Sequence, residues 1–342
     1  MKKILHVTMS NAYGGAETVI FSIIENLKKN NEFYYMCPKG NIEEILKRKN
    51  INYKTIKIKE LKKNIKSLDV DIIHAHDFKA SILCSLYKGE KNIISHLHTD
   101  HDWLKKFSLK SLIYLIASIK FNKIIIVSKS MTNNTWFYKF IKKKVDILIN
   151  PVDKSEIENL SRVEEINKNY DIAFLGRLSD YKDPLRFIDI VKLIKNEKAD
   201  IKAIIIGDGE LKHECIKKIE DNNLKKNIYM SGFLENPFPI IKKSKILVMP
   251  SKAEALGLSA MQSMVLGKPV VASNVGGLKD FINRFNGNLC VGNNEFKESI
   301  LEILNNKKIY NNLSEGAKNT SDKLCNINDY MNKLNYIYNK EI

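Results

Sequence analysis

The stretch from residue 246 to residue 277 most constrains how this chain can fold. It begins with a continuous apolar run, 246–249, of the kind found in buried parallel strands. Pro250 ends this run, and a loop containing Glu254 leads into apolar residues at helical spacing. Gly267 and Pro269 stop that helix, and a second apolar run follows. Strand, helix and strand in this order predict a βαβ unit, with a helix N-terminus at the carboxyl edge of a parallel sheet, where phosphates bind.

The alternation of strands and helices continues along the whole chain, with one interruption at Asn150-Pro151-Val152-Asp153. It predicts an α/β protein of two Rossmann-like domains that face each other across a cleft, which is the expected site. We expect an N-terminal domain over 1–150, a C-terminal domain over 151–325, and a C-terminal helix over 326–342 that packs back on the first domain. The expected strands are 3–8, 33–37, 53–58, 70–73, 92–97, 123–127, 145–149, 171–175, 201–206, 228–230, 245–249, 270–272 and 288–291.

Positive charge is concentrated in the first half of the chain. Residues 1–150 contain 27 Lys and Arg against 13 Asp and Glu, a net charge of +14. Residues 151–342 contain 29 against 26, a net charge of +3. An anionic membrane or nucleic acid would account for this asymmetry, and lysines on solvated faces account for much of the total. Aromatic residues do not interleave with the lysines as in nucleic-acid-binding motifs, so we expect no nucleic acid.

Cysteine usage and hydropathy indicate a cellular location. The five cysteines are scattered and odd in number, which fits a reducing cytoplasm and neither a disulfide framework nor a zinc site. The longest uncharged apolar segment, 111–119, is too short to span a bilayer, and the first strand follows the N-terminus without a signal sequence. We therefore expect a cytoplasmic protein, peripheral at the inner face of the plasma membrane through its basic first domain.

Two cations follow the first strand of the second half. Gly176-Arg177 comes directly after that strand, and Lys182 lies shortly before a helix that starts at Pro184. Arg offers a planar fork and Lys a point charge, so the pair suits a diphosphate. The turn Gly207-Asp208-Gly209 closes the next strand but has Lys212 in place of a third glycine. Because the full dinucleotide fingerprint is absent, we do not expect a dehydrogenase.

A histidine-rich segment ends one strand of the first half: His96, His98, Asp100, His101 and Asp102. It can be interpreted as a metal site. Since the second half already supplies cations for phosphates, we expect no metal here. We predict that His98 is an active-site residue and that His96 is buried. His74 and His76 end another strand, and either line the substrate side of the expected cleft or pack in the core.

The segment 103–120 is predicted to be one basic, apolar helix. Its apolar face is Leu104, Phe107, Leu112, Leu115, Ile116 and Ile119, with Lys105, Lys106, Lys110 and Lys120 beside it. Such a helix can lie in a membrane interface. The alternative is a core helix of the first domain whose lysines reach back to water.

Several of these motifs together resemble the family-four retaining glycosyltransferases of GT-B fold, of the kind that build bacterial surface glycans. The resemblance covers nearly the whole chain. The motifs that carry it are Gly14-Gly15-Ala16-Glu17, Gly176-Arg177 with Lys182, Gly207-Asp208-Gly209, Pro250-Ser251 with Glu254, and Gly267-Lys268-Pro269-Val270. Asn150-Pro151-Val152-Asp153 looks like the interdomain hinge of this family.

The resemblance implies a role for each matching residue. Arg177 and Lys182 would neutralise the diphosphate of a nucleotide sugar as it leaves. Glu254 would hydrogen-bond the donor sugar, and His98 would contact the donor sugar or the acceptor. The other residues that would bind the donor are Gly14, Gly15, Gly209, Phe233, Gly257, Leu258 and Gln262.

Gln262 is a departure from the family pattern. The family has a second glutamate eight residues after the first, where its carboxylate accepts hydrogen bonds from ribose hydroxyls. Here that position is Gln262, whose carbonyl oxygen is a neutral and weaker acceptor. We expect donor binding that is altered but retained.

The implied reaction is transfer of a hexosyl or N-acetylhexosaminyl group from a nucleotide-diphosphate sugar, UDP-linked, to a lipid-linked or growing surface polysaccharide. Retention of configuration and independence from metals and other cofactors follow from the same resemblance. Three alternatives remain at this stage. They are a nucleotide-sugar epimerase of the same fold, a basic membrane- or nucleic-acid-binding protein without enzymatic activity, and a non-catalytic relative in which Gln262 marks lost function.

Overall fold

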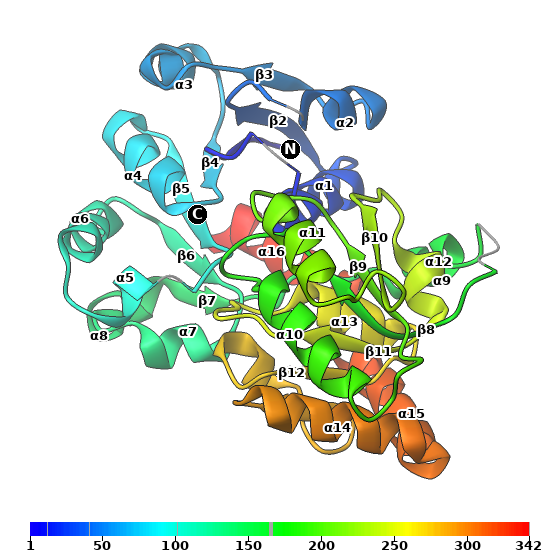
Figure 1. Ribbon diagram of the computed structural model, residues 1–342. Coiled ribbons are helices and arrows are strands. Elements are labelled where there is room, and N and C mark those ends of the chain that lie inside the picture. Colours follow the sequence, from blue (N-terminus) through cyan, green and yellow to red (C-terminus); the bar gives the residue numbers. More distant parts are fainter. Residues whose placement is uncertain (12, 41, 101, 164–166, 342) are drawn as a thin grey trace. The chain divides into compact units, whose positions relative to one another are not determined.

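Two parallel β-sheets organise the chain, one in each of two units (Figure 1). The computed structural model describes residues 1–11, 13–40, 42–100, 102–163 and 167–341. Unit 1 comprises Met1–Pro151 together with Ile327–Ile342, and unit 2 comprises Val152–Asn326. The C-terminal segment thus belongs with the N-terminal sheet, and the chain passes between the units at Pro151 and again at Asn326.

The sheet of unit 1 has its described strands in the order β3-β2-β1-β4-β5-β6-β7, all parallel. The order reverses between β1 and β4, so the loops after these two strands leave the sheet in opposite directions and flank a crevice. The strands are β1 (Lys2–Val7), β2 (Asn31–Cys37), β3 (Tyr53–Thr55), β4 (Ile72–Ala75), β5 (Asn92–Leu97), β6 (Lys123–Ile126) and β7 (Val145–Ile147).

Helices cover both faces of this sheet. On one face α1 packs against α16, and their apolar side chains share a core with Ile4, Ile72 and Ile94 of the sheet. On the other face α4 packs against α3 and α6. The helices of unit 1 are α1 (Gly15–Leu27), α2 (Ile42–Arg48), α3 (Leu61–Ser67), α4 (Phe78–Tyr87), α5 (Asp102–Lys105), α6 (Leu109–Ser118), α7 (Lys129–Asn134), α8 (Tyr138–Ile141) and α16 (Ile327–Tyr336), with short turns η1 (Ile58–Glu60), η2 (Lys142–Lys144) and η4 (Ile337–Glu341).

The prediction of one continuous helix over 103–120 is wrong. The chain forms two helices, α5 and α6, because Ser108 caps the second: its Oγ accepts from Ser111 N at 3.2 Å, and Ser111 Oγ accepts from Ser108 N at 2.9 Å. The predicted apolar face is broken as well. Leu104 is buried, whereas Phe107 is 70% exposed.

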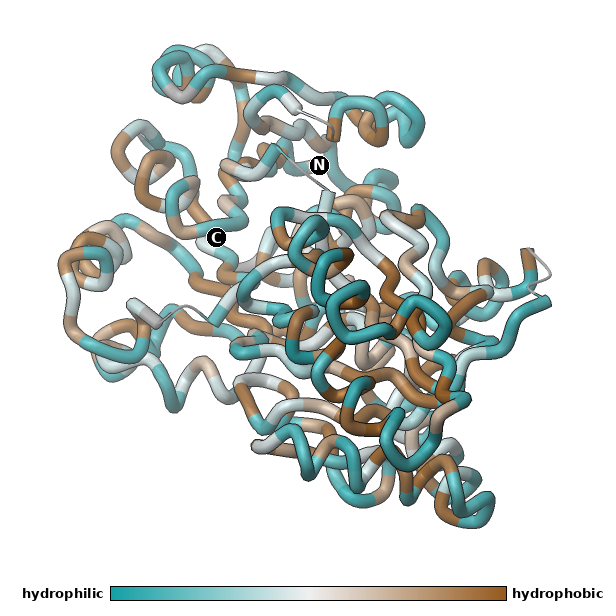
Figure 2. The backbone as a smooth tube through the Cα atoms, viewed as in Figure 1, coloured by the Kyte–Doolittle hydropathy of each residue, from teal (hydrophilic) through white to brown (hydrophobic). Residues whose placement is uncertain are grey.

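Helix α6 turns its apolar side outward. The side chains that it buries are Ser111, Tyr114, Ala117 and Ser118. Tyr114 Oη is hydrogen-bonded to Ser95 Oγ at 2.7 Å, so a polar contact ties the helix to the sheet. The exposed side chains at its surface are Leu109, Ile113, Ile116 and Ile119, and the hydropathy colouring of α6 shows this apolar content (Figure 2). The core-helix interpretation therefore holds for one side of α6 only.

The sheet of unit 2 has its described strands in the order β10-β9-β8-β11-β12-β13, again all parallel. Here the order reverses between β8 and β11. Apolar side chains from both sides of the reversal, including Phe174 and Val248, belong to one core cluster. The strands are β8 (Tyr170–Leu175), β9 (Ala203–Ile206), β10 (Ile228–Gly232), β11 (Ser244–Met249), β12 (Val270–Ser273) and β13 (Gly287–Cys290).

The helices of unit 2 begin where local chemistry predicts. Helix α10 starts with Pro184, and Asp183 caps it by accepting from Arg186 N at 3.1 Å. Helix α10 packs against α11 and α14, while α13 packs against α9 and α15. The helices are α9 (Lys154–Leu160), α10 (Pro184–Lys195), α11 (Lys212–Asp221), α12 (Phe238–Lys242), α13 (Leu258–Val265), α14 (Asn293–Asn305) and α15 (Lys307–Leu324), with the turn η3 (Gly276–Asp280).

Most element ends differ from the predicted ones by a few residues. The strand predicted over 53–58 ends at Thr55, because the chain enters the turn η1. The strand predicted over 70–73 is shifted to Ile72–Ala75 and so includes His74. Within the residues that the structure describes, no helix is both long and apolar enough to cross a membrane.

Candidate functional site

In unit 2, the loops that follow β8 and β11 meet where the strand order reverses. Lys182, in the loop after β8, donates a hydrogen bond from Nζ to Oε1 of Glu254, in the loop after β11. Glu254 is buried, with 8% of its side chain exposed, and it also accepts from Ser251 Oγ at 3.0 Å. A buried carboxylate needs such partners, and removal of Lys182 would leave it with an uncompensated charge. Two predicted site residues are thus in direct contact.

Arg177 is held by a different acid. Its Nε donates to Glu210 Oε2 at 3.1 Å, and the two side chains are 67% and 54% exposed. The exposed guanidinium can therefore change partner at little cost. The two predicted cations do not share a carboxylate: one lies in a half-buried ion pair and the other in an open one.

Close backbone packing builds the glycine turn after β9. Gly207 has φ of +144°, and a Cβ there would lie 1.9 Å from the carbonyl oxygen of Gly176. Leu178 N donates to Asp208 O at 3.0 Å, which joins the turn to the loop that carries Arg177. A side chain at position 207 would separate these loops, so the glycine is required for packing between loops. The loop that carries Arg177, a candidate for phosphate binding, is therefore supported by the glycine turn after β9.

A second glycine pair supports the loop of Glu254. At Gly276, where φ is +49°, a Cβ would lie 1.7 Å from the carbonyl oxygen of Glu254. Gly277 N donates to the same oxygen at 3.0 Å. The backbone at this pair therefore lies directly against the loop of Glu254. The pair holds the backbone that presents this carboxylate.

Helix α13 starts directly after this loop. Gly257, at its N-cap, has φ of +91° and contributes no side-chain cap, so the first N–H groups of the helix are available to an anion. Leu258 is the first residue of the helix. Gln262 lies one turn further and is half-buried, whereas Phe233, after β10, is 55% exposed. These residues stay candidates for binding a nucleotide.

In unit 1 the loop after β1 is fastened to the start of α4. Asp77 Oδ2 accepts from Met9 N at 2.6 Å, and Asp77 Oδ1 accepts from Ala80 N at 2.7 Å. Gly14 and Gly15 lie at the end of this loop, at the N-cap and first residue of α1. Glu17, in the first turn, is buried, and burial raises its pKa to about 7. The glycine pair therefore follows a loop that is held to α4 by the half-buried Asp77.

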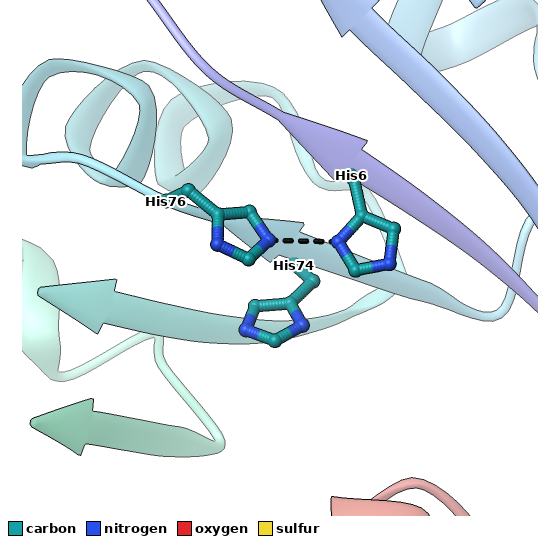
Figure 3. Close-up of side chains that lie close together, drawn as sticks. All are labelled: His6, His74 and His76. Carbon is teal, nitrogen blue, oxygen red and sulfur yellow. Dashed lines mark hydrogen bonds between the residues drawn. The ribbon is translucent and has the colours of Figure 1, made fainter. Parts of the chain in front are cut away.

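Five histidines form a row on one face of the unit 1 sheet. His6, His74 and His96 lie in the neighbouring strands β1, β4 and β5, and His76 and His98 directly follow β4 and β5. Alternate residues along an extended chain share a face. His6 pairs in register with His74, and each ring lies close to the next (Figure 3). The rings are those of His6, His74, His76, His96 and His98. All are buried except His98, which is partly exposed.

Burial keeps these imidazoles uncharged. It lowers the pKa of His6 and of His98 to about 3, and it lowers the pKa values of the other three well below the usual range. Neighbouring rings lower the pKa values of His74, His76 and His96 further, because a second positive charge would be close by. His96 is buried, as predicted.

The row includes two triplets whose nitrogen atoms lie within 4.8 Å of one another, His6 with His74 and His76, and His76 with His96 and His98. Two nitrogens that share a zinc ion at about 2.0–2.1 Å lie about 3.3 Å apart in tetrahedral geometry. His6 Nδ1 and His76 Nε2 are 2.7 Å apart, which fits a hydrogen bond and is too short for that arrangement. The geometry therefore favours hydrogen bonds between rings.

Asp100, an acidic residue of the predicted histidine cluster, makes its hydrogen bond outside this row. Asp100 is buried and accepts from Asn134 Nδ2 at 3.0 Å, so it holds its loop to α7. His101 lies outside the described residues, as does the side chain of Asp102. His6 is a member of the row that was not predicted from the sequence. A possible signal was its place on the first strand, facing the same side as the histidines of the next strands.

The chain has two doubly wound parallel sheets in tandem, which is the architecture of GT-B proteins. Residues 13–156 match the sequence model of Glycosyltransferase Family 4, and residues 156–320 match that of Glycosyl transferases group 1. The chain belongs to the family-four glycosyltransferases, and its activity is sugar transfer.

Individual relatives agree with this assignment. The chain is 31% identical over 295 residues to the uncharacterized glycosyltransferase MJ1178 of Methanocaldococcus jannaschii, covering 83% of this chain and 79% of that protein. It is 28% identical over 292 residues to an Escherichia coli UDP-Gal:alpha-D-GlcNAc-diphosphoundecaprenol alpha-1,3-galactosyltransferase, covering 78% and 70%. The crystal structure of Anabaena HepE in complex with UDP-glucose superimposes with a TM-score of 0.84 at 18% identity, over 99% of each chain.

These comparisons confirm the predicted fold class and family. They favour a glycosyltransferase over the epimerase of the same fold and over a binding protein without enzymatic activity. The individual site residues and the predicted domain limits stay predictions.

The buried histidines predict a stability that depends on pH. Each ring has an ordinary pKa near 6.5 when unfolded and a lowered one when folded, so the unfolded chain binds more protons below pH 6.5. Stability is therefore fully present above pH 6.5 and is lost as the pH falls toward 3, by on the order of 1 kcal/mol per ring at pH 5.5. Glu17, with its raised pKa, acts in the opposite direction but is one group against five.

Urea unfolding at pH 7.5 and 5.5 measures this effect. Both tryptophans, Trp103 and Trp136, lie in unit 1, so their fluorescence follows that unit alone. Unit 2 contains a single histidine, His213, so the part of the circular dichroism transition that the fluorescence does not follow is the internal control. We expect the fluorescence midpoint to drop at pH 5.5 and His6→Leu to reduce the drop. Equal fluorescence midpoints at the two pH values would contradict the prediction.

Proposed function

We propose that this enzyme transfers a hexosyl or N-acetylhexosaminyl group from a UDP-linked donor to a lipid-linked or growing surface polysaccharide, with retention of configuration and without a metal or other cofactor. The observation that carries the proposal is the contact between Lys182 and Glu254 beside the N-terminus of α13. It places a cation, a carboxylate and free N–H groups together at the carboxyl edge of a parallel sheet. These groups suit a diphosphate attached to a sugar.

Each cation has a carboxylate partner that a diphosphate can replace. Arg177 would leave Glu210, and Lys182 would leave Glu254, to bind the phosphate oxygens. Glu254, released from Lys182, then accepts hydrogen bonds from hydroxyl groups of the donor sugar. The N–H groups at Gly257 and Leu258 bind the phosphates at the helix start. Gly14 and Gly15 remain proposed donor-binding residues of unit 1.

In the reaction, the bond between the anomeric carbon and the phosphate oxygen breaks, and the acceptor hydroxyl oxygen bonds to that carbon on the same face. The departing phosphate oxygen takes the proton of the acceptor hydroxyl, so atoms and charge balance. Arg177 and Lys182 stabilise the negative charge that develops on the leaving diphosphate. Because these cations supply the positive charge, the step needs no metal ion.

The choice of donor and acceptor is supported by relatives. The Escherichia coli relative takes its sugar from UDP-Gal and has a diphosphoundecaprenol-linked acceptor, according to its name. The HepE structure contains UDP-glucose. The family resemblance implies that Phe233 and Gln262 contact the nucleoside, and that His98 contacts the donor sugar or the acceptor.

Calorimetric titration with UDP, GDP and NAD tests the donor site. We expect binding of UDP and at least tenfold weaker binding in Arg177→Ala and Lys182→Ala, because each loses a charge-assisted hydrogen bond worth about 1.5–3 kcal/mol. Lys198→Ala is the control, since its ion pair with Asp200 lies in the loop between α10 and β9. If the protein binds none of the three nucleotides, the proposal is wrong.

Gln262→Glu tests the assignment of this position to the ribose. A carboxylate is a stronger acceptor than an amide for the ribose hydroxyls, so we expect several-fold tighter UDP binding. Gln262→Leu, which removes the acceptor, should weaken binding. The assignment fails if the Gln262→Glu variant binds UDP with unchanged affinity.

We further propose that unit 1 is peripheral at the anionic inner face of the plasma membrane. Helix α6 exposes Leu109, Ile113, Ile116 and Ile119, and the exposed Lys106, Lys110 and Lys120 lie in or next to it. Apolar side chains bordered by lysines suit the interface of an anionic bilayer, where each lysine contributes about 1 kcal/mol. Such a location brings the enzyme to a lipid-linked acceptor.

Sedimentation with vesicles tests this location. We expect binding to phosphatidylglycerol vesicles, weaker binding to phosphatidylcholine, and loss of most binding in Ile116→Asp. Ile216→Asp, at an exposed apolar residue of unit 2, should bind normally. If the wild-type protein stays in the supernatant with phosphatidylglycerol vesicles at low salt, or Ile116→Asp and Ile216→Asp bind equally, the membrane proposal is wrong.

A further inference from the structure

The histidine row of unit 1 consists of two hydrogen-bonded chains. In one, His6 Nδ1 lies 2.7 Å from His76 Nε2, and His76 Nδ1 lies 3.0 Å from His98 Nε2. In the other, the hydroxyl of Tyr338 lies 2.7 Å from His74 Nδ1, and His74 Nε2 lies 3.2 Å from His96 Nδ1. Only the first chain ends at a predicted active-site residue, His98.

The first chain must have a direction. A neutral imidazole has one N–H donor and one bare nitrogen acceptor. Both nitrogens of His76 are used, so one donates and the other accepts. The N–H groups of the chain therefore all point toward His98 or all point toward His6. The two directions give His98 different tautomers: the proton is on Nδ1 in the first case and on Nε2 in the second.

The group beyond His98 selects the direction. Nδ1 of His98 and Oδ1 of Asn150 are both buried and have no hydrogen-bond partner within normal geometry among the described residues. The side chain of Asn150 raises the pKa of His98, because it interacts favourably with a proton on the imidazole ring. A proton on Nδ1 supplies a donor for the unpaired oxygen of Asn150. The opposite direction leaves that oxygen without a donor and places an N–H of His6 in a buried position with no acceptor.

We propose that His76, supported by His6, holds His98 as the neutral tautomer with its proton on Nδ1. His76 and His6 are positioning residues, because they act through His98. In this tautomer Nε2 of His98 is occupied by the N–H of His76, and Nδ1–H is a donor. His98 then serves as an uncharged hydrogen-bond donor to an oxygen, and it is unable to accept a proton as a general base through either nitrogen.

The consequence for sugar transfer rests on the proposed function. When a substrate is bound, an oxygen of the sugar or of the acceptor accepts the hydrogen bond from Nδ1–H of His98. This oxygen either replaces the oxygen of Asn150 or shares the N–H with it. A neutral donor orients this oxygen, whereas a positively charged imidazolium at His98 would also attract the phosphates of the donor. The role of proton acceptor remains with the departing diphosphate.

Nitrogen-15 NMR of the histidine-labelled protein tests the tautomer without any substrate. The protonated and bare nitrogens of a neutral imidazole have well separated shifts, and His98→Asn and His6→Leu assign the signals. We expect Nδ1–H for His6, His76 and His98, with His98 neutral down to pH 5. A proton on Nε2 of His98, titration near pH 6.5, or shifts of His6 and His76 on addition of Zn²⁺ would overturn the inference.

A matched pair of variants tests the positioning role. The amide of His76→Gln can donate to His98 Nε2 and accept from His6, whereas His76→Leu can do neither. We expect the Nδ1–H signal of His98 to persist in His76→Gln and to become a tautomer mixture in His76→Leu. Tryptophan fluorescence establishes that unit 1 is folded in both. Identical His98 signals in the two variants would contradict the role of His76.

Transfer assays then separate this inference from the proposed function. We expect His76→Leu to lower kcat about tenfold, His76→Gln to stay within about twofold, and both to bind UDP as the wild-type protein does. If the NMR result holds and transfer by His76→Leu is unchanged, the chain stands and the contact of His98 with substrate is wrong. If UDP does not bind, the donor site is wrong, whatever the tautomer.

Discussion

The reversal of strand order between β8 and β11 is the constraint on which the candidate donor site depends. Lys182 and Glu254 are 72 residues apart in the chain and meet because the loops after these two strands flank that reversal. Parallel strands all end at the same edge, so polar loop residues gather there while apolar side chains fill the sheet faces. The same reversal between β1 and β4 brings Asp77 to the loop that follows β1.

Glycines make these loop contacts possible. The carbonyl of Gly176 lies where a Cβ of residue 207 would be, and the carbonyl of Glu254 lies where a Cβ of residue 276 would be. The loops can therefore support one another through their backbones and leave their side chains for ligands. Both predicted cations are engaged by carboxylates, Arg177 by Glu210 and Lys182 by Glu254.

Buried imidazole rings inside unit 1 are hydrogen-bonded to one another. The row of imidazoles continues the buried face that contains Ile4 and Ile72, and a buried polar ring is tolerated there because the next ring is its hydrogen-bond partner. Burial keeps the rings neutral, and a neutral ring has one donor and one acceptor. A chain of such rings transmits a choice of tautomer from His6 to His98, at the carboxyl edge of the sheet.

The sequence by itself determined the fold class and the family, because hydrophobic periodicity and loop motifs are local features. The alternation of strands and helices, and motifs such as Gly176-Arg177 and Gly267-Lys268-Pro269, can be recognised without knowing which residues touch. Which side chains contact each other depends on strand order and register, and local sequence patterns do not specify these. Only the tertiary structure showed that Lys182 contacts Glu254 and that Arg177 contacts Glu210.

The same physical reason explains the two main differences from expectation. The apolar residues of 103–120 suggested one helix, but the hydrogen bonds of Ser108 divide it, and packing against β5 decides that α6 buries Ser111 and Tyr114 while Ile116 stays exposed. The histidines of three strands were visible in the sequence as separate residues. Their assembly into a hydrogen-bonded row was decided by the parallel register, which aligns His6 with His74 and places the neighbouring rings within reach.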